Sequence, residues 1–475
     1  MNRFETKIDY LKYATLKEVA REAWEGNLVE TVLDIPKRIV PGKTSTMRCC
    51  VYKERAIIQE RIKLATGGNR RNPNIIQVID IACDECPIGG YEVTNSCRGC
   101  LAQRCKDACP KDAISFDPHT HQAIIDKTKC VNCGACSRAC QYSAIANRRR
   151  PCEGACPVKA IAPNEEKISK INADKCTNCG YCISQCPFGA IMDKSFILDA
   201  IDYILRSEKN TLYKVHAIVA PAIADSFKDA TFGQLVTALK KLGFYDVLEV
   251  ALGADMVGMM EAQELTEKGF LFSSCCPGFV AFVKKNYPDL AQYISHTPSP
   301  MAALGQHLRK LDPDSKIIFI GPCTAKKEEI RREDVRDIID VALTFEELLA
   351  LFDSRDITPS ELEEEDLKQA SPYGRAFAAS GGVAAAIKQG LKEIGSPLEF
   401  KPEICSGLDE CKIAMLKKRR NILQANFVEG MACKGGCIYG AGVLNKFDVK
   451  KANVDKYAGR SPYETIKDSV EAAEK

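Results

Sequence analysis

The chain has no apolar run approaching the ~20 residues that cross a bilayer, and its start, MNRFETKIDYLKYA, lacks the apolar core of a signal peptide. It also lacks an excess of either charge, because 66 Lys and Arg residues stand against 63 Asp and Glu residues without long blocks of one sign. This balance gives no reason to expect nucleic acid or an anionic membrane as a partner. We therefore expect a cytoplasmic protein that binds neither.

Histidine is scarce, whereas cysteine is abundant. Only five histidines occur, and none lies within a cysteine motif, so we expect no imidazole ligand to a cluster. The 25 cysteines, in a chain without a secretion signal, indicate metal binding or catalysis rather than disulfides, because a reducing compartment keeps thiols free. The length of 475 residues allows two or three domains.

Residues 1–90 are expected to form a helical N-terminal segment with accessory cysteines. Apolar residues recur at helical spacing in LKEVAREAWEGNLVETVLDI and in YKERAIIQERIKLA, with a segment bearing Pro and Gly between them. The adjacent Cys49 and Cys50 are interpreted as structural thiols. Cys83 and Cys86 form a CxxC pair, which is half of a metal site until partners are found.

Residues 91–190 carry the most specific cysteine pattern. The runs that begin at Cys130 and Cys176 both read CxxCxxCxxxC, in which three close thiolates hold one 4Fe-4S cube and the fourth reaches another cube. Zinc is the alternative occupant, but zinc sites use paired CxxC or Cys/His groups and do not need the repeated Cys-Pro found here. The pattern resembles two-cluster bacterial ferredoxins, arranged twice in tandem.

The ferredoxin resemblance assigns these cysteines to three or four clusters. The crossover rule gives two complete clusters in the first repeat and one in the second. The members are Cys97, Cys100, Cys105 and Cys140; Cys130, Cys133, Cys136 and Cys109; and Cys176, Cys179, Cys182 and Cys156. Cys152 and Cys186 are left two ligands short, and Cys83 and Cys86 could complete a fourth cluster.

From residue 191 onward, apolar strands alternate with amphipathic helices in VHAIVAPAIA, TFGQLVTALKKLGF, DVLEVALGA, KGFLFSS and SKIIFIGPC. This alternation predicts a parallel or mixed α/β arrangement, in which ligands collect at the carboxyl ends of strands. Two such strands end in cysteine, at Cys275-Cys276 and at Cys323. Residues 354–369 are expected to be a solvated helical face, and residues 148–150 an exposed loop.

The stretch EGMACKGGCIYGAG, residues 429–442, separates Cys433 from Cys437 by four positions. On one helical turn such side chains share a face, about 5–6 Å apart at Cβ, so two thiolates could hold neighbouring metal centres. Gly435 and Gly436 would let a bulky group lie against the backbone. The alternative is a pair of buried thiols that pack as small hydrophobic groups.

Three motifs in order, SSCCPGF, GPCTAKKEE and EGMACKGGC, resemble the active-site signatures of the iron-only (FeFe) hydrogenases. The resemblance implies an α+β and α/β protein: a ferredoxin-like 4Fe-4S region followed by a two-lobed α/β domain, residues 191–475, that encloses an H-cluster. This cofactor is a 4Fe-4S cube bridged through one cysteine sulfur to a two-iron unit with CO, cyanide and a dithiolate. The implied cube ligands are Cys276, Cys323, Cys433 and Cys437, with Cys437 as the bridge.

The resemblance also implies the reaction 2 H⁺ + 2 e⁻ ⇌ H₂ and a path for protons. Adjacent side chains of an extended segment point to opposite sides, so Cys275 and Cys276 should not both bind the cube. The resemblance implies that Cys275 is the free thiol and acts as general acid and base. The alternative is an inert buried thiol. Glu261 and Glu264 can share a helical face, and with Ser295 they match the family's relay. Glutamates at this spacing are otherwise commonly surface residues.

Further residues match pocket positions of the family. Lys326 would place its ammonium against a cyanide, and Glu329 could orient it. The pocket-lining candidates are Ala220, Pro221, Ala222, Met301 and Phe377. Several positions depart from the common pattern, because many members carry Met at Gly321, Gln at Met301 and Ser at Ala222. These departures put rate, catalytic bias and oxygen tolerance in doubt, since such contacts tune redox potential.

Two other functions stay open. A hydrogen sensor would bind the same cofactor, but the residues after Gly442 are too few for a signalling domain. An iron-sulfur assembly protein that resembles hydrogenases would have no reason to keep Cys275, Lys326 and the glutamate pair together. For the hydrogenase, the expected partners are a small ferredoxin and the maturation proteins. Cys405 and Cys411 are interpreted as structural thiols.

Overall fold

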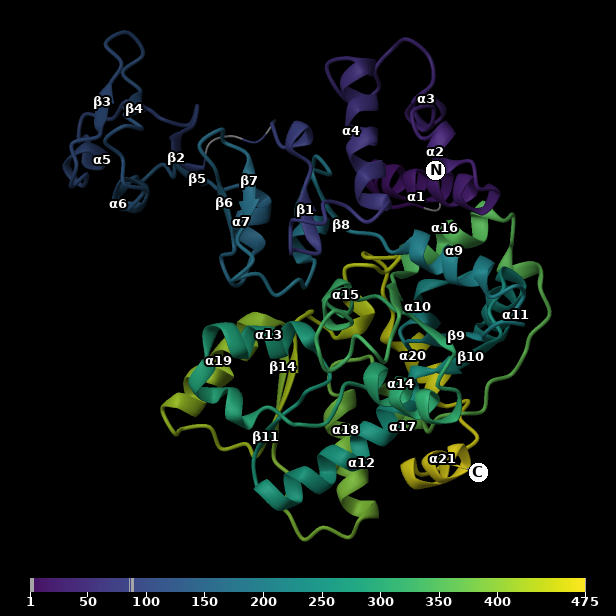
Figure 1. Ribbon diagram of the computed structural model, residues 1–475. Helices are drawn as coiled ribbons and strands as arrows, with labels where there is room; N and C mark the ends of the chain where they lie inside the picture. The colour runs from purple at the N-terminus through teal and green to yellow at the C-terminus, as the bar shows by residue number, and fades with distance from the viewer. Residues whose placement is uncertain (1–3, 85, 87–88, 475) are drawn as a thin grey trace.

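The computed structural model describes residues 4–84, 86 and 89–474, and its chain begins with the expected helices (Figure 1). The first helix starts at a capping Thr6, whose hydroxyl accepts from the Asp9 N–H at 3.1 Å, and it ends at Gly26, where φ is 75°. The helices are α1 (Lys7–Glu25), α2 (Leu28–Thr31), α3 (Ile35–Ile39) and α4 (Val51–Ala65). In the part of the chain described, no helix has the length and apolar character of a membrane span.

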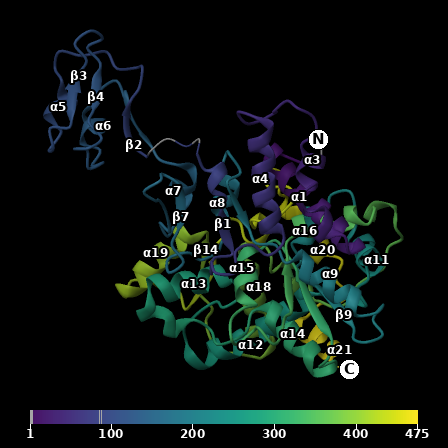
Figure 2. The same cartoon turned by 45° about the horizontal axis from the view of Figure 1, so that its top comes forward.

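A first ferredoxin-like unit, residues 90–148 and here called the arm, projects from the rest of the molecule (Figures 1 and 2). Its elements pack on one another, with α5 against α6 and β2 against β4 and β5. Strand β2 is antiparallel to β5, and β3 to β4. The elements are β2 (Gly90–Val93), α5 (Arg104–Asp107), β3 (Ile114–Phe116), β4 (Ala123–Ile125), α6 (Ala135–Ala139) and β5 (Ile145–Arg148).

A second such unit, here called the inner unit, lies between the arm and the main body. Strand β1 of the N-terminal segment pairs antiparallel with β8 and so completes this unit from outside its own cysteine runs. The elements are β1 (Ile76–Val78), η1 (Asp80–Ala82), α7 (Pro151–Ala155), β6 (Ile161–Pro163), β7 (Ser169–Ile171), α8 (Tyr181–Gln185) and β8 (Ile191–Asp193). Strands β6 and β7 form an antiparallel pair.

The body has two lobes, each built on a parallel sheet. The first sheet has the order β10-β9-β12-β13, and every residue of β9 is buried because helices cover both faces. The elements of this lobe are α9 (Ile197–Arg206), β9 (Val215–Val219), α10 (Ile223–Ser226), α11 (Phe232–Leu242), β10 (Asp246–Glu249), β12 (Lys316–Ile320), α15 (Thr324–Glu329), β13 (Val341–Leu343) and α16 (Phe345–Ser354).

The second sheet, β11-β15-β14, is also parallel, and α12, α14 and α18 pack together beside it. The predicted fold class, α+β and α/β with a ferredoxin-like region, is therefore confirmed. The remaining elements are α12 (Val250–Lys268), β11 (Leu271–Phe272), α13 (Pro277–Asn286), η2 (Pro288–Tyr293), α14 (Pro300–Leu311), η3 (Pro359–Glu361), α17 (Pro372–Ala376), α18 (Gly382–Glu393), β14 (Pro402–Ser406), α19 (Leu408–Arg419), β15 (Phe427–Met431), η4 (Cys437–Tyr439), α20 (Lys451–Ala458) and α21 (Ile466–Ala473).

Three local predictions were wrong. DVLEVALGA is a strand only over β10, since α12 begins at Val250. Residues 362–369 alternate between exposed and half-buried and are not helical, because their backbone bonds to α11: Thr237 donates to the Glu363 carbonyl at 2.8 Å, and the Glu365 N–H donates to the Gly233 carbonyl at 3.2 Å. Arg150 is not in an exposed loop, because its guanidinium is buried and donates to the Ser169 hydroxyl at 3.0 Å.

A buried network of charges joins the N-terminal segment, the inner unit and the body. Asp193 at the end of β8 pairs with Lys12 of α1 and with Lys327 of α15, both at 2.7 Å. Lys327 also pairs with Glu347 of α16 at 2.8 Å. Burial opposes charge, but the two lysines together hold the pKa of Asp193 well below its ordinary value. The network therefore ties the helix next to Cys323 to elements that precede and follow the ferredoxin-like units.

Candidate active site

Three loops at the carboxyl ends of β11, β12 and β15 bring four cysteines together. Cys276 precedes α13, Cys323 precedes α15, and Cys433 and Cys437 follow β15. The Cys276 sulfur accepts from the Ala432 N–H at 3.4 Å. Burial raises the pKa of Cys433 and of Cys437, and the nearby Cys276 and Cys323 raise both further. The predicted convergence at the strand ends is thus seen in the structure.

The loop with Cys433 and Cys437 is not the helical turn that the spacing suggested. Gly435 and Gly436 have φ angles of 91° and 95°, in the left-handed region that favours glycine. A Cβ atom on Gly436 would lie 2.7 Å from the Ala378 carbonyl oxygen, because the loop passes that closely over the chain before α18. The two thiols therefore approach each other through a turn rather than along one helix face.

The donor set fits an iron-sulfur cube. It consists of thiols alone, which are the soft ligands that iron-sulfur clusters take. Burial raises the pKa of Cys323 to about 12 and raises the pKa of Cys433 and Cys437 as well, so these three thiols would stay protonated without a metal. A bound cluster replaces those protons and gives the four thiolates a countercharge.

Lys326 lies beside this group with its side chain fixed on two sides. Its ammonium donates to the Ser299 hydroxyl at 2.8 Å and pairs with Glu329 at 2.6 Å. Ser299 also caps α14, where its hydroxyl accepts from the Ala302 N–H at 3.4 Å. Burial raises the pKa of both Cys323 and Cys437, and the charge of Lys326 opposes this rise, so its ammonium faces the two thiols.

The predicted relay residues Glu261, Ser295 and Glu264 lie in turn near one another, and Glu261 lies near enough to Cys275 to raise its pKa. The Ser274 N–H and hydroxyl donate to Glu261 Oε1 at 2.9 and 3.0 Å, and Glu261 Oε2 has no hydrogen-bond partner in the described structure. Ser295 donates to Glu264 at 2.5 Å and lies near enough to Glu261 to lower its pKa slightly. Burial nevertheless raises the pKa of Glu261 to about 7.

Glu264 is the outer member of this chain. Burial alone would raise its pKa, but hydrogen bonds from Lys268, Ser295 and the His296 N–H hold it below the ordinary value. The Lys268 ammonium donates to Glu264 at 2.6 Å, and the exposed His296 ring lies 3.1 Å from that ammonium. The inner carboxyl is thus poised near neutrality, while the outer one stays ionised.

The pocket candidates occupy the surrounding core. Phe377 packs in the same apolar cluster as Cys275, whose pKa burial raises well above its ordinary value. A Cβ atom on Gly321 would lie 3.0 Å from the Cβ of Ala220, so glycine there allows the β9 and β12 ends to approach. Pro221, Ala222 and Met301 are also buried.

The third predicted cysteine group touches the loops that carry the four converging cysteines. The Thr324 hydroxyl, next to Cys323, donates to the Asn178 carbonyl at 2.8 Å. A Cβ atom on Gly278, two residues after Cys276, would lie 2.9 Å from Ala432 and 3.9 Å from Cys179. Burial raises the pKa of Cys182 well above its ordinary value, and Cys179, Cys176 and Cys156 add to the shift. The structure therefore places this group directly beside the site of Cys276, Cys323, Cys433 and Cys437.

The two cysteine groups of the arm show the crossover grouping. Burial raises the pKa of Cys105, and Cys100 and Cys140 raise it further. Burial likewise raises the pKa of Cys136, and Cys130 and Cys109 add to that rise. The crossover cysteines share one feature, since each sulfur accepts from the N–H four residues later at 3.2–3.4 Å. These cysteines are Cys109, Cys140, Cys156 and Cys186.

The fourth group also comes together. Burial raises the pKa of Cys86, and Cys186 and Cys83 raise it further. The pKa of Cys152 is raised by burial and by the same two thiols. The Cys152 sulfur lies 3.7 Å from the Ser169 hydroxyl, and the Ser169 N–H donates to Cys83 at 3.4 Å. The CxxC pair thus meets the two cysteines that the second repeat left without partners.

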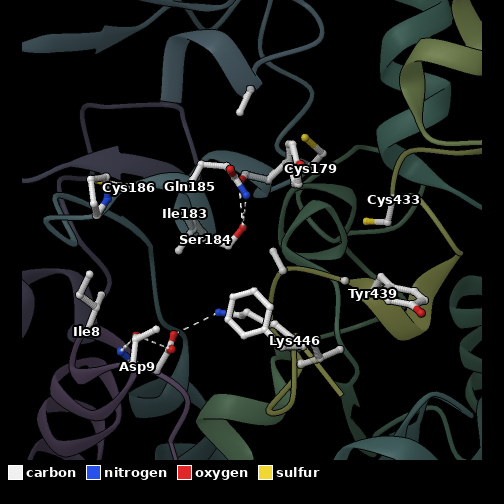
Figure 3. Close-up of a pocket in the computed structure, with 18 of the residues that line it drawn as sticks. Ile8, Asp9, Cys179, Ile183, Ser184, Gln185, Cys186, Cys433, Tyr439 and Lys446 are labelled. Atoms are coloured by element: carbon white, nitrogen blue, oxygen red, sulfur yellow. Dashed lines mark hydrogen bonds and ion pairs between the residues drawn. The ribbon is translucent and has the colours of Figure 1, made fainter. Parts of the chain in front are cut away.

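A cavity of about 1290 Å³ lies where α1, α8 and the Cys433 loop meet (Figure 3). Cys179, Cys186 and Cys433 line it, so three of the cysteine groups border the same space. On its lower side in the figure, Lys446 pairs with Asp9 of α1 at 3.2 Å. The N-terminal segment therefore closes one side of the junction between the groups.

The sequence analysis missed the residues that orient the site. Ser274 holds Glu261, Ser299 holds Lys326, and the Ser406 hydroxyl accepts from the Gly435 N–H at 2.7 Å. Cys405 and Cys411 were interpreted as separate structural thiols, yet they are close enough that Cys405 raises the pKa of Cys411. Serines adjoin several of the cysteine motifs, which was the only signal for these contacts in the sequence.

Comparison with known proteins adds the following. Residues 213–441 match the family described as iron only hydrogenase large subunit, C-terminal domain. A 4Fe-4S dicluster domain matches residues 96–144, and a 4Fe-4S binding domain matches residues 169–192. The chain is 30% identical over 415 residues to iron hydrogenase 1 of Clostridium pasteurianum. This alignment covers 75% of this chain and 71% of that protein.

Two other similarities are narrower. Over 95 residues the chain is 36% identical to the cytosolic Fe-S cluster assembly factor NAR1 of Eremothecium gossypii. This alignment covers 20% of this chain and 21% of that protein. A structure of the FeFe-hydrogenase HydA1 from Chlamydomonas reinhardtii aligns with a TM-score of 0.47 at 22% identity, covering 58% of this chain and 93% of that one.

Proposed function

Because this chain belongs to the iron-only hydrogenase family, we propose that it catalyses the reversible reaction 2 H⁺ + 2 e⁻ ⇌ H₂ at an H-cluster. The observation that carries the proposal is the meeting of four thiols from three strand ends with Lys326 and the buried Cys275 in one site. A site that only stored iron and sulfide would need the four thiols alone.

Cys276, Cys323, Cys433 and Cys437 hold the cube in this proposal, with Cys437 as the bridge to the two-iron unit. When bound, the two-iron unit supplies the open iron at which H₂ forms or is split. Lys326 supplies a charged donor for a cyanide, because Ser299 and Glu329 fix its ammonium toward the thiols. Ala220, Pro221, Ala222, Met301 and Phe377 line the pocket and exclude water.

Protons move through Cys275, Glu261, Ser295 and Glu264. Burial raises the pKa of the Cys275 thiol well above its ordinary value, so this thiol carries its proton at neutral pH. Glu261 has a pKa of about 7 and a free Oε2, so it can take up and release a proton near neutral pH. Ser295 donates to Glu264, which is held ionised and faces the surface through Lys268.

The ferredoxin-like cysteine groups would hold three to four further 4Fe-4S clusters, which would supply the path for electrons. The Cys179 group is the last before the catalytic site, because its loop contacts the segments with Cys276 and Cys323. The arm is the entry, since Cys100 and Cys133 there are exposed. We propose a small ferredoxin as the redox partner, maturation proteins as the source of the two-iron unit, and the cytoplasm as the location.

Infrared spectroscopy of the protein produced with maturation proteins tests the cofactor. We expect CO and CN stretching bands, and their absence from protein with full iron content in its cubes would overturn the proposal. The similarity to NAR1 favours one alternative, a role in iron-sulfur assembly, which predicts cubes without these bands.

A hydrogen-evolution assay of Cys275→Ser tests the proton path in protein that shows the bands. The rate should fall by about 10²–10⁴-fold, because a serine hydroxyl is a far weaker acid than a thiol. Cys411→Ser is the matched control, since this buried thiol lies outside the proposed path. An unchanged rate in Cys275→Ser would remove that thiol from the mechanism.

A further inference from the structure

Two arginines that lie against the inner unit are among the largest fully buried side chains of the described structure. Arg61 comes from α4, and Arg150 comes directly before α7. Both lie at the group formed by Cys83, Cys86, Cys152 and Cys186, here called the fourth site. The family matches cover residues 96–144, 169–192 and 213–441, so none of them covers Arg61, Arg150 or the CxxC pair.

Arg61 is fixed against the segment that carries Cys186. Its Nη2 donates to the Gly189 carbonyl at 2.5 Å, and the Gly189 N–H in turn donates to the Cys186 carbonyl at 3.1 Å. A Cβ atom on Gly189, where φ is 60°, would also lie 2.5 Å from Nη2. The guanidinium therefore packs directly on the backbone turn that follows Cys186, and glycine is what lets it approach.

The charge of Arg61 has no carboxylate partner among the described residues. The side chain is 2% exposed, its Nε has no hydrogen-bond partner, and it lines the same cavity as Cys186. The charges that act on it are Cys186, Arg48 and, more weakly, Asp9. A buried charge without a countercharge costs several kcal/mol, so the fold at this point requires an anion close to Cys186.

Arg150 approaches the same site from the other side. Its Nη1 lies 3.9 Å from the Cys83 sulfur, and its Nε lies 3.6 Å from the Glu153 carboxylate. The cations beside two other cysteine groups are more exposed than Arg61 and Arg150. Arg138 and Lys285 are exposed residues that donate to the carbonyls of Cys133 and Cys176. Water screens those charges, whereas Arg61 is buried and has no ion pair among the described residues.

We propose that Arg61, together with Arg150, is the countercharge of a 4Fe-4S cube at the fourth site and makes it the highest-potential cube of the ferredoxin-like region. This inference rests on the proposed function, because it needs a cube there. A cube with four thiolates is anionic, and reduction adds one more negative charge. A buried unpaired cation stabilises the reduced form most, so electrons that enter through the arm should collect at this site before they pass to the Cys179 cube.

The test is a potentiometric titration followed by EPR of the reduced cubes, on the full chain with its clusters. The double variant Cys83→Ser/Cys86→Ser first identifies the fourth site as the component that disappears while the iron content falls by one cube. In the parent protein this component should be the first of the ferredoxin-like cubes to become reduced. If the iron content is unchanged in the double variant, the cube at this site is refuted, whatever Arg61 does.

Arg61→Gln then tests the charge itself. We expect about a tenfold smaller reduced-to-oxidised ratio for this component at a fixed potential, which is ~59 mV for one electron. Arg61→Lys keeps the charge and should retain most of the parent ratio. Arg55→Gln is the matched control on the same helix, because Arg55 donates to the Val40 and Gly42 carbonyls instead.

Two outcomes would overturn the inference while leaving the cube in place. One is an unchanged ratio in Arg61→Gln at full iron content, and the other is a parent component that is reduced last. Loss of this one cube in Arg61→Gln, together with its retention in Arg61→Lys, would support the inference, because it shows that the site needs the charge.

Discussion

The arm and the inner unit share one cysteine pattern but have different surroundings. In the arm, Cys100 and Cys133 are exposed, and the packing of the elements is internal. In the inner unit, Cys152 and Cys186 are buried, and β1, α4 and the loops of the body cover the clustered thiols. The spacing of the ligands thus fixes the local fold, while the elements packed around it fix solvent access and charge.

The largest expected difference between the two regions concerns their ion pairs. Lys327→Met would leave Asp193 and Glu347 buried without this partner, so the free energy of unfolding should fall by about 3–5 kcal/mol. The matched change in the arm is Arg148→Met, which removes an exposed pair with Glu92 and should cost less than about 1 kcal/mol. Chemical denaturation measures both, and equal losses would contradict the contrast.

The stability contributions of one buried carboxyl in the body and one exposed carboxyl in the arm should change with pH in opposite directions. Burial raises the pKa of Asp255 in α12 to about 6, so the folded body binds a proton that the unfolded chain has released. Its stability should therefore fall, by on the order of 3 kcal/mol, as pH rises from about 4 to 6. In the arm, hydrogen bonds from Thr120 and His119 lower the pKa of Asp117, so that contribution is instead lost as pH falls.

Unfolding measured at several pH values checks this contrast. Asp255→Asn resembles the protonated acid and should flatten the change between pH 4 and 6, whereas Asp117→Asn should not. If Asp255→Asn keeps the parent slope, another group in the body is responsible.

A smaller effect should separate the roles of the two units in electron transfer. Cys179→Ala removes a ligand next to the catalytic cysteines and should lower hydrogen evolution about 10–100-fold with every electron donor. Cys133→Ala in the arm should lower the rate only with a protein donor, because a small reductant can bypass the arm. Assays with ferredoxin and with reduced viologen distinguish the two, and an equal loss for Cys133→Ala with both donors would contradict the arm as the entry.

Much of the site could be predicted from the sequence, because ligand spacing is local. The ferredoxin runs indicated their own clusters, and cysteines that end strands were expected to meet. The turn at Gly435 and Gly436 could not be predicted, since it depends on the chain before α18, which would lie 2.7 Å from a Cβ atom on Gly436. Arg61 and Arg150 look like surface residues in the sequence, and only tertiary packing buries them.

The pairing of β2 with β5 has a consequence for how the molecule is assembled. Gly90 and Arg148 are paired residues at the two ends of the arm, so the arm begins and ends at nearly the same place. Cys86 and Cys152 of the fourth site lie on either side of it in the chain. The arm is in effect a self-contained module inserted into a loop of the inner unit, and replacing it with a short linker should leave the remaining chain able to close around its own cysteines.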